Sequence, residues 1–192
     1  MDKKILYEPI TQSPYCCVPA CLSMILDRRK IIHGSQEDIG YDLGLTVPED
    51  KAGLFKRVRI GKKPSAGYGT KVSTPRYSIN HYFKKYRIYL KEEYYPIRKV
   101  HDIKKFIATN LKNNNDVIVC FNNKRLHGIG DYGHVSLIQD INKGYLTIID
   151  PGINVPKIRR VRLSKLIDAI EHHGEKNRAG FWIISKRISQ HS

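Results

Sequence analysis

The sequence has no long apolar run. Its beginning carries Lys3 and Lys4, but the apolar stretch that follows is interrupted by Glu8, Gln12 and Pro14. No run approaches the roughly 18 apolar residues that a membrane-spanning helix needs. We therefore expect neither a targeting signal nor a membrane span, and a cytoplasmic, reducing environment.

Acidic residues are scarce. The chain has 18 Asp and Glu against 34 Lys and Arg, a net charge of +16 with neutral histidines and a pI of about 9.7. Such a charge raises the local concentration of polyanions. The basic residues are spread over 54–63, 83–87 and 157–165, without aromatic residues repeating between them as a stacking platform. We expect weak, non-specific polyanion binding that salt abolishes; a dedicated nucleic-acid or anionic-surface binder is an alternative.

Length and composition indicate one globular domain. With 192 residues, of which 41% are hydrophobic and 27% charged, the chain can bury a sizeable core. It lies outside the disordered and collagen-like classes. We interpret residues 1–192 as a single domain.

Cysteine is also rare, but three of the four cysteines fall within six positions, in the stretch QSPYCCVPACLSMIL of residues 12–26. A disulfide is disfavoured by a reducing compartment, and neighbouring Cys16 and Cys17 would close a strained ring. Zinc is disfavoured because CVPAC has the spacing CxxxC and no second cysteine pair follows. We expect no metal or other cofactor, and we expect Cys21 and Cys120 to be small buried hydrophobes.

Helical patterning comes first along the chain. A segment from Cys17 to about Asp27 has Pro19 in its first turn and continues with apolar residues. The tetrapeptide at 35–38, SQED, has the form of a capping box that opens a short helix closed by Gly44. We also expect amphipathic helices at 101–112 and 164–172 and a long irregular connection at 46–76.

The second half of the chain contains β-rich runs, at residues 116–121, 134–141, 145–150 and 180–185. Helices first and strands later predict an α+β fold. The connection INKG at 141–144 suits an antiparallel hairpin, which brings the start of one strand beside the end of the next. Because His134 starts the first strand and Asp150 ends the second, we expect the imidazole and the carboxylate to lie within hydrogen-bonding reach.

Cys17 differs from the other cysteines because it lies in the first turn of the expected helix. Unpaired N–H groups and the positive end of the helix dipole favour a thiolate at such a position. An imidazole such as that of His134 can pair with this thiolate, and the Asp150 carboxylate can orient the imidazole. Gln12, five residues upstream, can donate to an oxyanion together with the Cys17 backbone N–H. Cys16 is the alternative nucleophile, since helix starts are uncertain by one or two residues.

The motifs QSPYCCVPACLSMIL, GHVSLI and TIIDPG, in this order, resemble those of the C39 and C39-like group of papain-like cysteine peptidases. The resemblance implies a papain-like α+β fold in which N-terminal helices pack on an antiparallel sheet. It implies Cys17 as the nucleophile, His134 as the general base and Asp150 as the acid that orients it. It also implies Gln12 as the oxyanion donor. The expected activity is hydrolysis of a peptide or protein substrate through a thioester acyl-enzyme, by a stand-alone domain.

Other interpretations stay open beside hydrolysis. The resemblance implies Gly directly after the nucleophile, whereas this chain has Val18, which favours a catalytically inactive domain that holds a peptide. Acyl transfer by the same apparatus is a further variant. The segment GIGDYG at 128–133 matches GxGxxG, but a strand is expected after it, so a dinucleotide site is excluded. We expect its glycines to form a mobile loop leading to His134.

Thiol reactivity tests the special position of Cys17. Because a helix start beside a histidine favours the thiolate, Cys17 is expected to react with iodoacetamide fastest of the four cysteines. Labelling at several pH values, followed by mass mapping, measures this order. Faster labelling of Cys21 or Cys120 would contradict the activated-thiol hypothesis.

Overall fold

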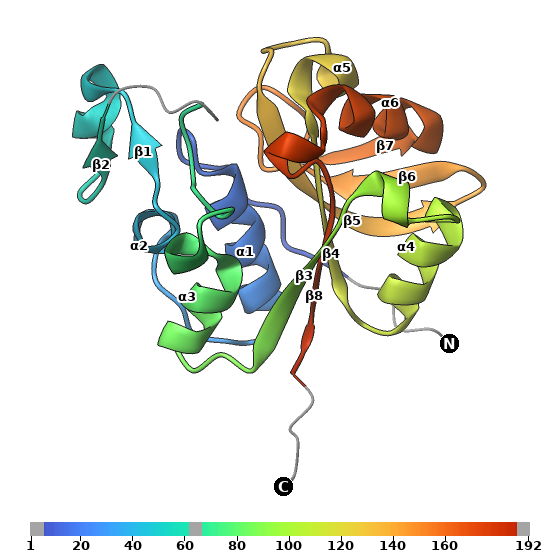
Figure 1. Ribbon diagram of the computed structural model, residues 1–192, viewed down its shortest axis with the longest axis horizontal. Helices are drawn as coiled ribbons and strands as arrows, with labels where there is room; N and C mark the ends of the chain where they lie inside the picture. The colour runs from blue at the N-terminus through green and yellow to red at the C-terminus, as the bar shows by residue number, and fades with distance from the viewer. Residues whose placement is uncertain (1–5, 62–66, 188–192) are drawn as a thin grey trace, which may run out of the picture.

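A six-stranded antiparallel sheet runs through the middle of the molecule, with helices on both of its faces (Figure 1). The computed structural model describes residues 6–61 and 67–187. The strands lie in the spatial order β3 (Leu90–Tyr95), β8 (Gly180–Lys186), β4 (Asp116–Asn122), β5 (Gly133–Asn142), β6 (Tyr145–Ile149) and β7 (Ile158–Arg162). Each strand pairs antiparallel with its neighbours.

In the described part of the chain, three helices cover each face of the sheet, as Figure 1 shows for their arrangement. On one face lie α1 (Cys17–Arg28), α2 (Gln36–Asp42) and α3 (Ile79–Lys85); on the other lie α4 (Ile103–Lys112), α5 (Asn123–His127) and α6 (Leu163–His173). The shorter elements are the parallel pair β1 (Thr46–Val47) and β2 (Arg59–Ile60), and the 3₁₀ turns η1 (Glu49–Leu54), η2 (Pro75–Tyr77), η3 (Ile97–Lys99) and η4 (Glu175–Asn177). The predicted α+β class is confirmed.

Strand β4 separates the two layers of the core. All seven of its residues are buried, as expected for a central strand that is covered on both faces. Side chains alternate between the faces of a strand, so Ile118 and Cys120 pack in the cluster under α1. Val117, Val119 and Phe121 pack in the cluster under α4 and α6.

The local signals in the sequence act as predicted. Helix α1 begins at Cys17. Ser35 and Asp38 form a reciprocal capping box at the start of α2, and Gly44 follows that helix with φ +74°. Residues Lys143 (φ 47°) and Gly144 (φ 78°) make a two-residue turn between β5 and β6, and positive φ at both positions is the type I′ geometry that suits paired strands.

Several elements were not predicted. Strand β7 lies in a stretch whose sequence is interpreted only as basic surface. Val161 alone of its five residues is buried, so the sequence gives little apolar signal for a strand there. Strand β3 and helices α3 and α5 were also missed; α3 and α5 have 7 and 5 residues, too few for a clear helical period. The irregular connection at 46–76 contains only short elements, and its residues 62–66 lie outside the described part of the chain, as do Lys3 and Lys4.

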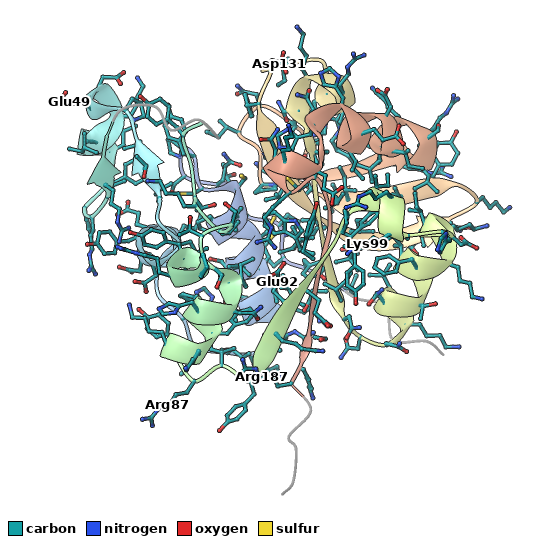
Figure 2. The ribbon with its side chains drawn as sticks, in the orientation of Figure 1. Glu49, Arg87, Glu92, Lys99, Asp131 and Arg187 are labelled. Carbon is teal, nitrogen blue, oxygen red and sulfur yellow. The ribbon has the colours of Figure 1, made fainter. Side chains whose placement is uncertain are left out.

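In Figure 2 the labels of Arg87 and Arg187 lie at the lower edge of the molecule, and those of Glu49 and Asp131 at its upper edge. A general basic surface stays a prediction. Among the described residues, no helix combines the length and the apolar character needed to cross a membrane.

A buried ion cluster fixes α1 against the sheet. Asp116, the first residue of β4, is fully buried and accepts hydrogen bonds from Arg28 Nε (2.8 Å) and Arg29 Nε (2.7 Å) at the end of α1. The Tyr7 hydroxyl donates to the same carboxylate over 2.9 Å. Because α1 carries Cys17 at its other end, this cluster helps to set where the thiol lies relative to the strands.

Replacing Asp116 with Ala is expected to destabilise the fold by about 3 kcal/mol or more, since it leaves two clustered arginines without their carboxylate. Asp50→Ala is the control, because Asp50 pairs with Lys51 at the surface and exposed pairs contribute less than about 1 kcal/mol. Chemical denaturation measures both free energies of unfolding. Equal, small losses would show that the cluster contributes no more than an exposed pair.

Candidate active site

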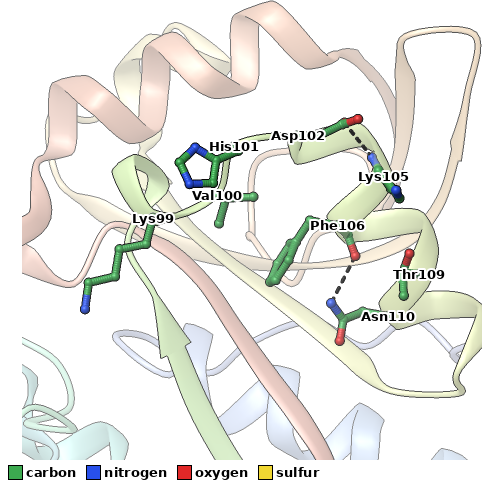
Figure 3. Close-up of a pocket in the computed structure, with 8 residues that line it drawn as sticks. All are labelled: Lys99, Val100, His101, Asp102, Lys105, Phe106, Thr109 and Asn110. Carbon is green, nitrogen blue, oxygen red and sulfur yellow. Dashed lines mark hydrogen bonds between the residues drawn. The ribbon is translucent and has the colours of Figure 1, made fainter.

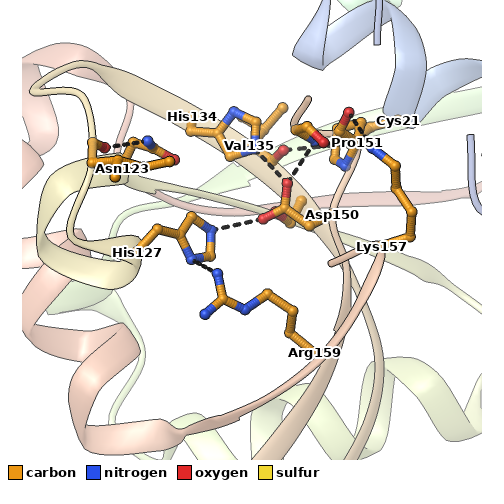
Figure 4. A network of polar contacts seen from close by, with 12 residues as sticks. Cys21, Asn123, His127, His134, Val135, Asp150, Pro151, Lys157 and Arg159 are labelled. Carbon is orange, nitrogen blue, oxygen red and sulfur yellow. Dashed lines mark hydrogen bonds and ion pairs between the residues drawn. The ribbon is translucent and has the colours of Figure 1, made fainter. Parts of the chain in front are cut away.

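The strand hairpin brings His134 and Asp150 together. His134 is the second residue of β5, and Asp150 directly follows β6, the antiparallel neighbour of β5. The His134 Nε2 and Asp150 Oδ1 atoms are 2.7 Å apart, and both side chains are almost completely buried. The contact expected from the spacing and the INKG turn is therefore present, and Figure 4 shows it.

Cys17 interacts with the same imidazole. It is the first residue of α1 and is partly exposed. Burial by itself lowers the pKa of His134, but interactions with Asp150 and with Cys17 raise this pKa to about 9. Since Asp150 engages Nε2, Nδ1 is the nitrogen left to exchange a proton with the Cys17 thiol.

The other three thiols are enclosed in apolar surroundings. Cys16 is fully buried beside Leu45, Val47 and Phe55, and burial raises its pKa to about 12. Burial likewise raises the pKa values of Cys21 and Cys120. A raised pKa favours the neutral, unreactive thiol, so the surroundings favour Cys17 over Cys16 as a nucleophile.

Gln12 lies close to the turn that follows Asp150. Its backbone N–H donates to the Pro151 carbonyl over 2.9 Å. Its side-chain Oε1 is buried and has no hydrogen-bond partner in the described part of the chain. The first turn of α1 has no side-chain cap from Cys16, its N-cap residue. The backbone contact thus places Gln12 beside the turn that follows Asp150, and its role as an oxyanion donor stays a prediction.

Val18, at the position where the resemblance implies Gly, is buried in the core between α1 and the sheet. Its side chain thus contributes to packing.

The Asp150 carboxylate receives four hydrogen bonds. Oδ1 accepts from His134 and from the Gly152 backbone N–H (2.8 Å); Oδ2 accepts from His127 Nε2 (2.7 Å) and from the Ser136 hydroxyl (3.0 Å). Burial by itself raises the pKa of Asp150, but the hydrogen bonds from His127 and His134 hold this pKa well below its usual range. Asp150 is therefore a buried, fully ionised carboxylate.

Two residues of this network were missed in the sequence. His127 ends α5, just before Gly128 at φ 83°, and its imidazole is fully buried. Arg159, in β7, donates to His127 Nδ1 (Figure 4). No motif marks His127, and Arg159 is one cation among several in a basic stretch, so only long-range packing reveals their contact with the site.

Other concave or titratable features lie apart from this network. A surface pocket beside η3 and α4 is formed by residues of the 99–110 segment (Figure 3). Two of its polar contacts are local helix contacts: Lys105 N–H donates to the Asp102 cap, and the Asn110 amide donates to the Phe106 carbonyl. Within residues 6–61 and 67–187, no group of three or more His, Cys, Asp or Glu side chains is arranged to hold a metal ion.

The raised pKa of His134 is directly testable. By NMR, its imidazole is expected to titrate near pH 9 instead of the usual 6.5 or so. In Cys17→Ala the titration moves to lower pH, because one of the two interactions that stabilise the imidazolium is lost. His134→Gln assigns the signal. Titration at the usual histidine value in the unaltered protein would contradict the described geometry.

The chain matches no protein-family model and no curated protein sequence, but solved structures resemble it. A C39-like peptidase structure from Bacillus anthracis aligns with a TM-score of 0.61 and 16% identity, over 97% of this chain and 99% of that one. A double-glycine-motif protease from an AMS/PCAT transporter, in complex with the leader peptide, aligns with a TM-score of 0.54 and 15% identity, over 96% of this chain and 94% of that one. The fold of this chain is therefore the papain-like α+β fold of the C39 peptidases.

Proposed function

We propose that this protein is a cysteine peptidase in which Cys17 is the nucleophile, His134 the general base and acid, and Asp150 the residue that orients His134. The observation that carries the proposal is the 2.7 Å contact between His134 and Asp150, together with the interaction of Cys17 with the same imidazole. Cys17 lies at the start of a helix, in a fold shared with C39 peptidases.

Acylation begins with transfer of the Cys17 thiol proton to His134. The thiolate attacks the carbonyl carbon of the scissile peptide bond, and the carbonyl oxygen becomes an oxyanion. The Cys17 backbone N–H and the Gln12 carboxamide are the donors that we assign to this oxyanion. His134 then protonates the leaving nitrogen, the C–N bond breaks, and the amine product departs from a thioester on Cys17.

Deacylation uses the same groups in reverse. His134 takes a proton from water as the water oxygen attacks the thioester carbonyl carbon. The C–S bond breaks, the carboxylic acid product leaves, and Cys17 is restored as a thiolate beside protonated His134. If an amine replaces water, the same steps give acyl transfer.

A peptide is the substrate class that we propose. The AMS/PCAT protease with a similar fold was solved with a leader peptide bound, which supports peptide recognition by this architecture. All four cysteines are free, and a thiol nucleophile requires reducing conditions such as those of the cytoplasm, where we place the activity.

Single variants test the division of labour. Cys17→Ala is expected to abolish turnover of a mixed peptide library, detected by mass spectrometry, because no thioester can form. His134→Ala should cost nearly as much, and Asp150→Asn less, on the order of 10⁴-fold, because the base remains but loses its orientation. Thermal unfolding checks that each variant is folded.

Cys16→Ala is the matched control. Its cysteine neighbours Cys17 in sequence but lies in an apolar cluster, so turnover should stay within a few-fold of the unaltered protein. If His134→Ala leaves turnover and Cys17 labelling unchanged, the triad assignment is wrong. If the unaltered protein binds peptides but cleaves none, the non-catalytic peptide-binding alternative is favoured instead.

A further inference from the structure

The Asp150 carboxylate lies between two histidines, and Cys17 influences the pKa of one of them, His134. His134 binds Oδ1 and His127 binds Oδ2, each over 2.7 Å. We propose that His127 and Arg159 are positioning residues for the catalytic carboxylate. This inference rests on the proposed peptidase function and adds two residues that act through Asp150 without touching the reacting atoms.

The contact with Arg159 decides the tautomer of His127. A guanidinium has only N–H donors, so His127 Nδ1, which receives the Arg159 hydrogen bond, must be the unprotonated, accepting nitrogen. The ring proton is then on Nε2, which donates to Asp150 Oδ2. Arg159 thus holds His127 as a neutral donor aimed at the carboxylate.

A neutral donor on Oδ2 has an electrostatic consequence. A cationic His127 would compensate the Asp150 charge and leave less of it to stabilise an imidazolium at His134. The neighbouring Lys157 ammonium donates to the Pro151 and Gly152 carbonyls. Among the described side chains, the donors to Asp150 are those of His127, His134 and Ser136. His134 is accordingly the imidazole toward which the Asp150 charge can act.

The two imidazoles are also held by a shared aromatic ring. Phe121, on β4, meets both rings edge-on, with centroid distances of 5.6 Å and interplanar angles of 82° to His127 and 83° to His134. This packing limits rotation of both histidines. The carboxylate is therefore fixed on both oxygens by groups whose own positions are restricted, which is the arrangement that an orienting acid requires.

Four variants test this role through the rate of Cys17 alkylation by iodoacetamide between pH 6 and 10. His127→Phe keeps a buried ring but removes the donor to Oδ2, and it should slow alkylation at pH 7 by about tenfold. His127→Gln retains an N–H donor and should stay within about threefold of the unaltered protein. At pH 10 all rates should converge, because the thiol ionises without help from His134.

Arg159→Met should slow alkylation at pH 7. Without the guanidinium, His127 Nδ1 can carry the ring proton, and the hydrogen bond from Nε2 to Asp150 Oδ2 is then lost. Arg160→Met is the matched control. Arg160 is the next residue on β7, and its guanidinium carbon lies 4.3 Å from the centre of the Tyr145 ring. It should leave the profile unchanged.

NMR of the imidazole nitrogens gives a readout that does not depend on reactivity. At pH 7 the unaltered protein is expected to show His127 protonated at Nε2 and unprotonated at Nδ1. A proton on Nδ1, or alkylation of His127→Phe as fast as in the unaltered protein at pH 7, would overturn the inference. A slow His134→Ala beside a fast His127→Phe would contradict the positioning role alone. Unchanged rates in both would also contradict the proposed function.

Discussion

The site depends on one buried negative charge. Asp150 is fully buried and ionised, a state that is costly in a protein interior unless the charge is paired and hydrogen-bonded. Four donors meet this cost: two from β5, one from α5 and one from the turn after β6. Because these donors lie on different elements, the carboxylate also ties β5, β6 and α5 into one fixed arrangement.

The second constraint is the position of α1 relative to the sheet. A position at a helix start favours the thiolate form of a cysteine. A thiolate nucleophile in a peptidase also needs an imidazole within reach. Helix α1 packs through Leu22, Ile25 and other apolar residues against the sheet, and its far end is held by Asp116. These contacts help to place Cys17 where it interacts with His134.

Burial distinguishes the four cysteines. Cys16 and Cys17 are neighbours in sequence, but successive residues of a helix start point in different directions, so one enters an apolar cluster and the other faces the imidazole. The low dielectric around Cys16 favours its neutral thiol. Asp150 and His134 are buried as well, but their charged forms are favoured because each carries the opposite charge to the other. The pKa of His134 is therefore raised and that of Asp150 is lowered.

Much of this protein follows from local sequence signals. Pro19 in a first turn, the Ser35 and Asp38 capping box and the Lys143–Gly144 turn each act over a few residues, so α1, α2 and the hairpin with its His134–Asp150 contact could be predicted. The contact of His127 with Asp150 and that of Arg159 with His127 were decided only by the tertiary structure. These contacts join residues 23 and 32 positions apart, and they depend on how α5 and β7 pack on the sheet, which no short stretch of sequence encodes.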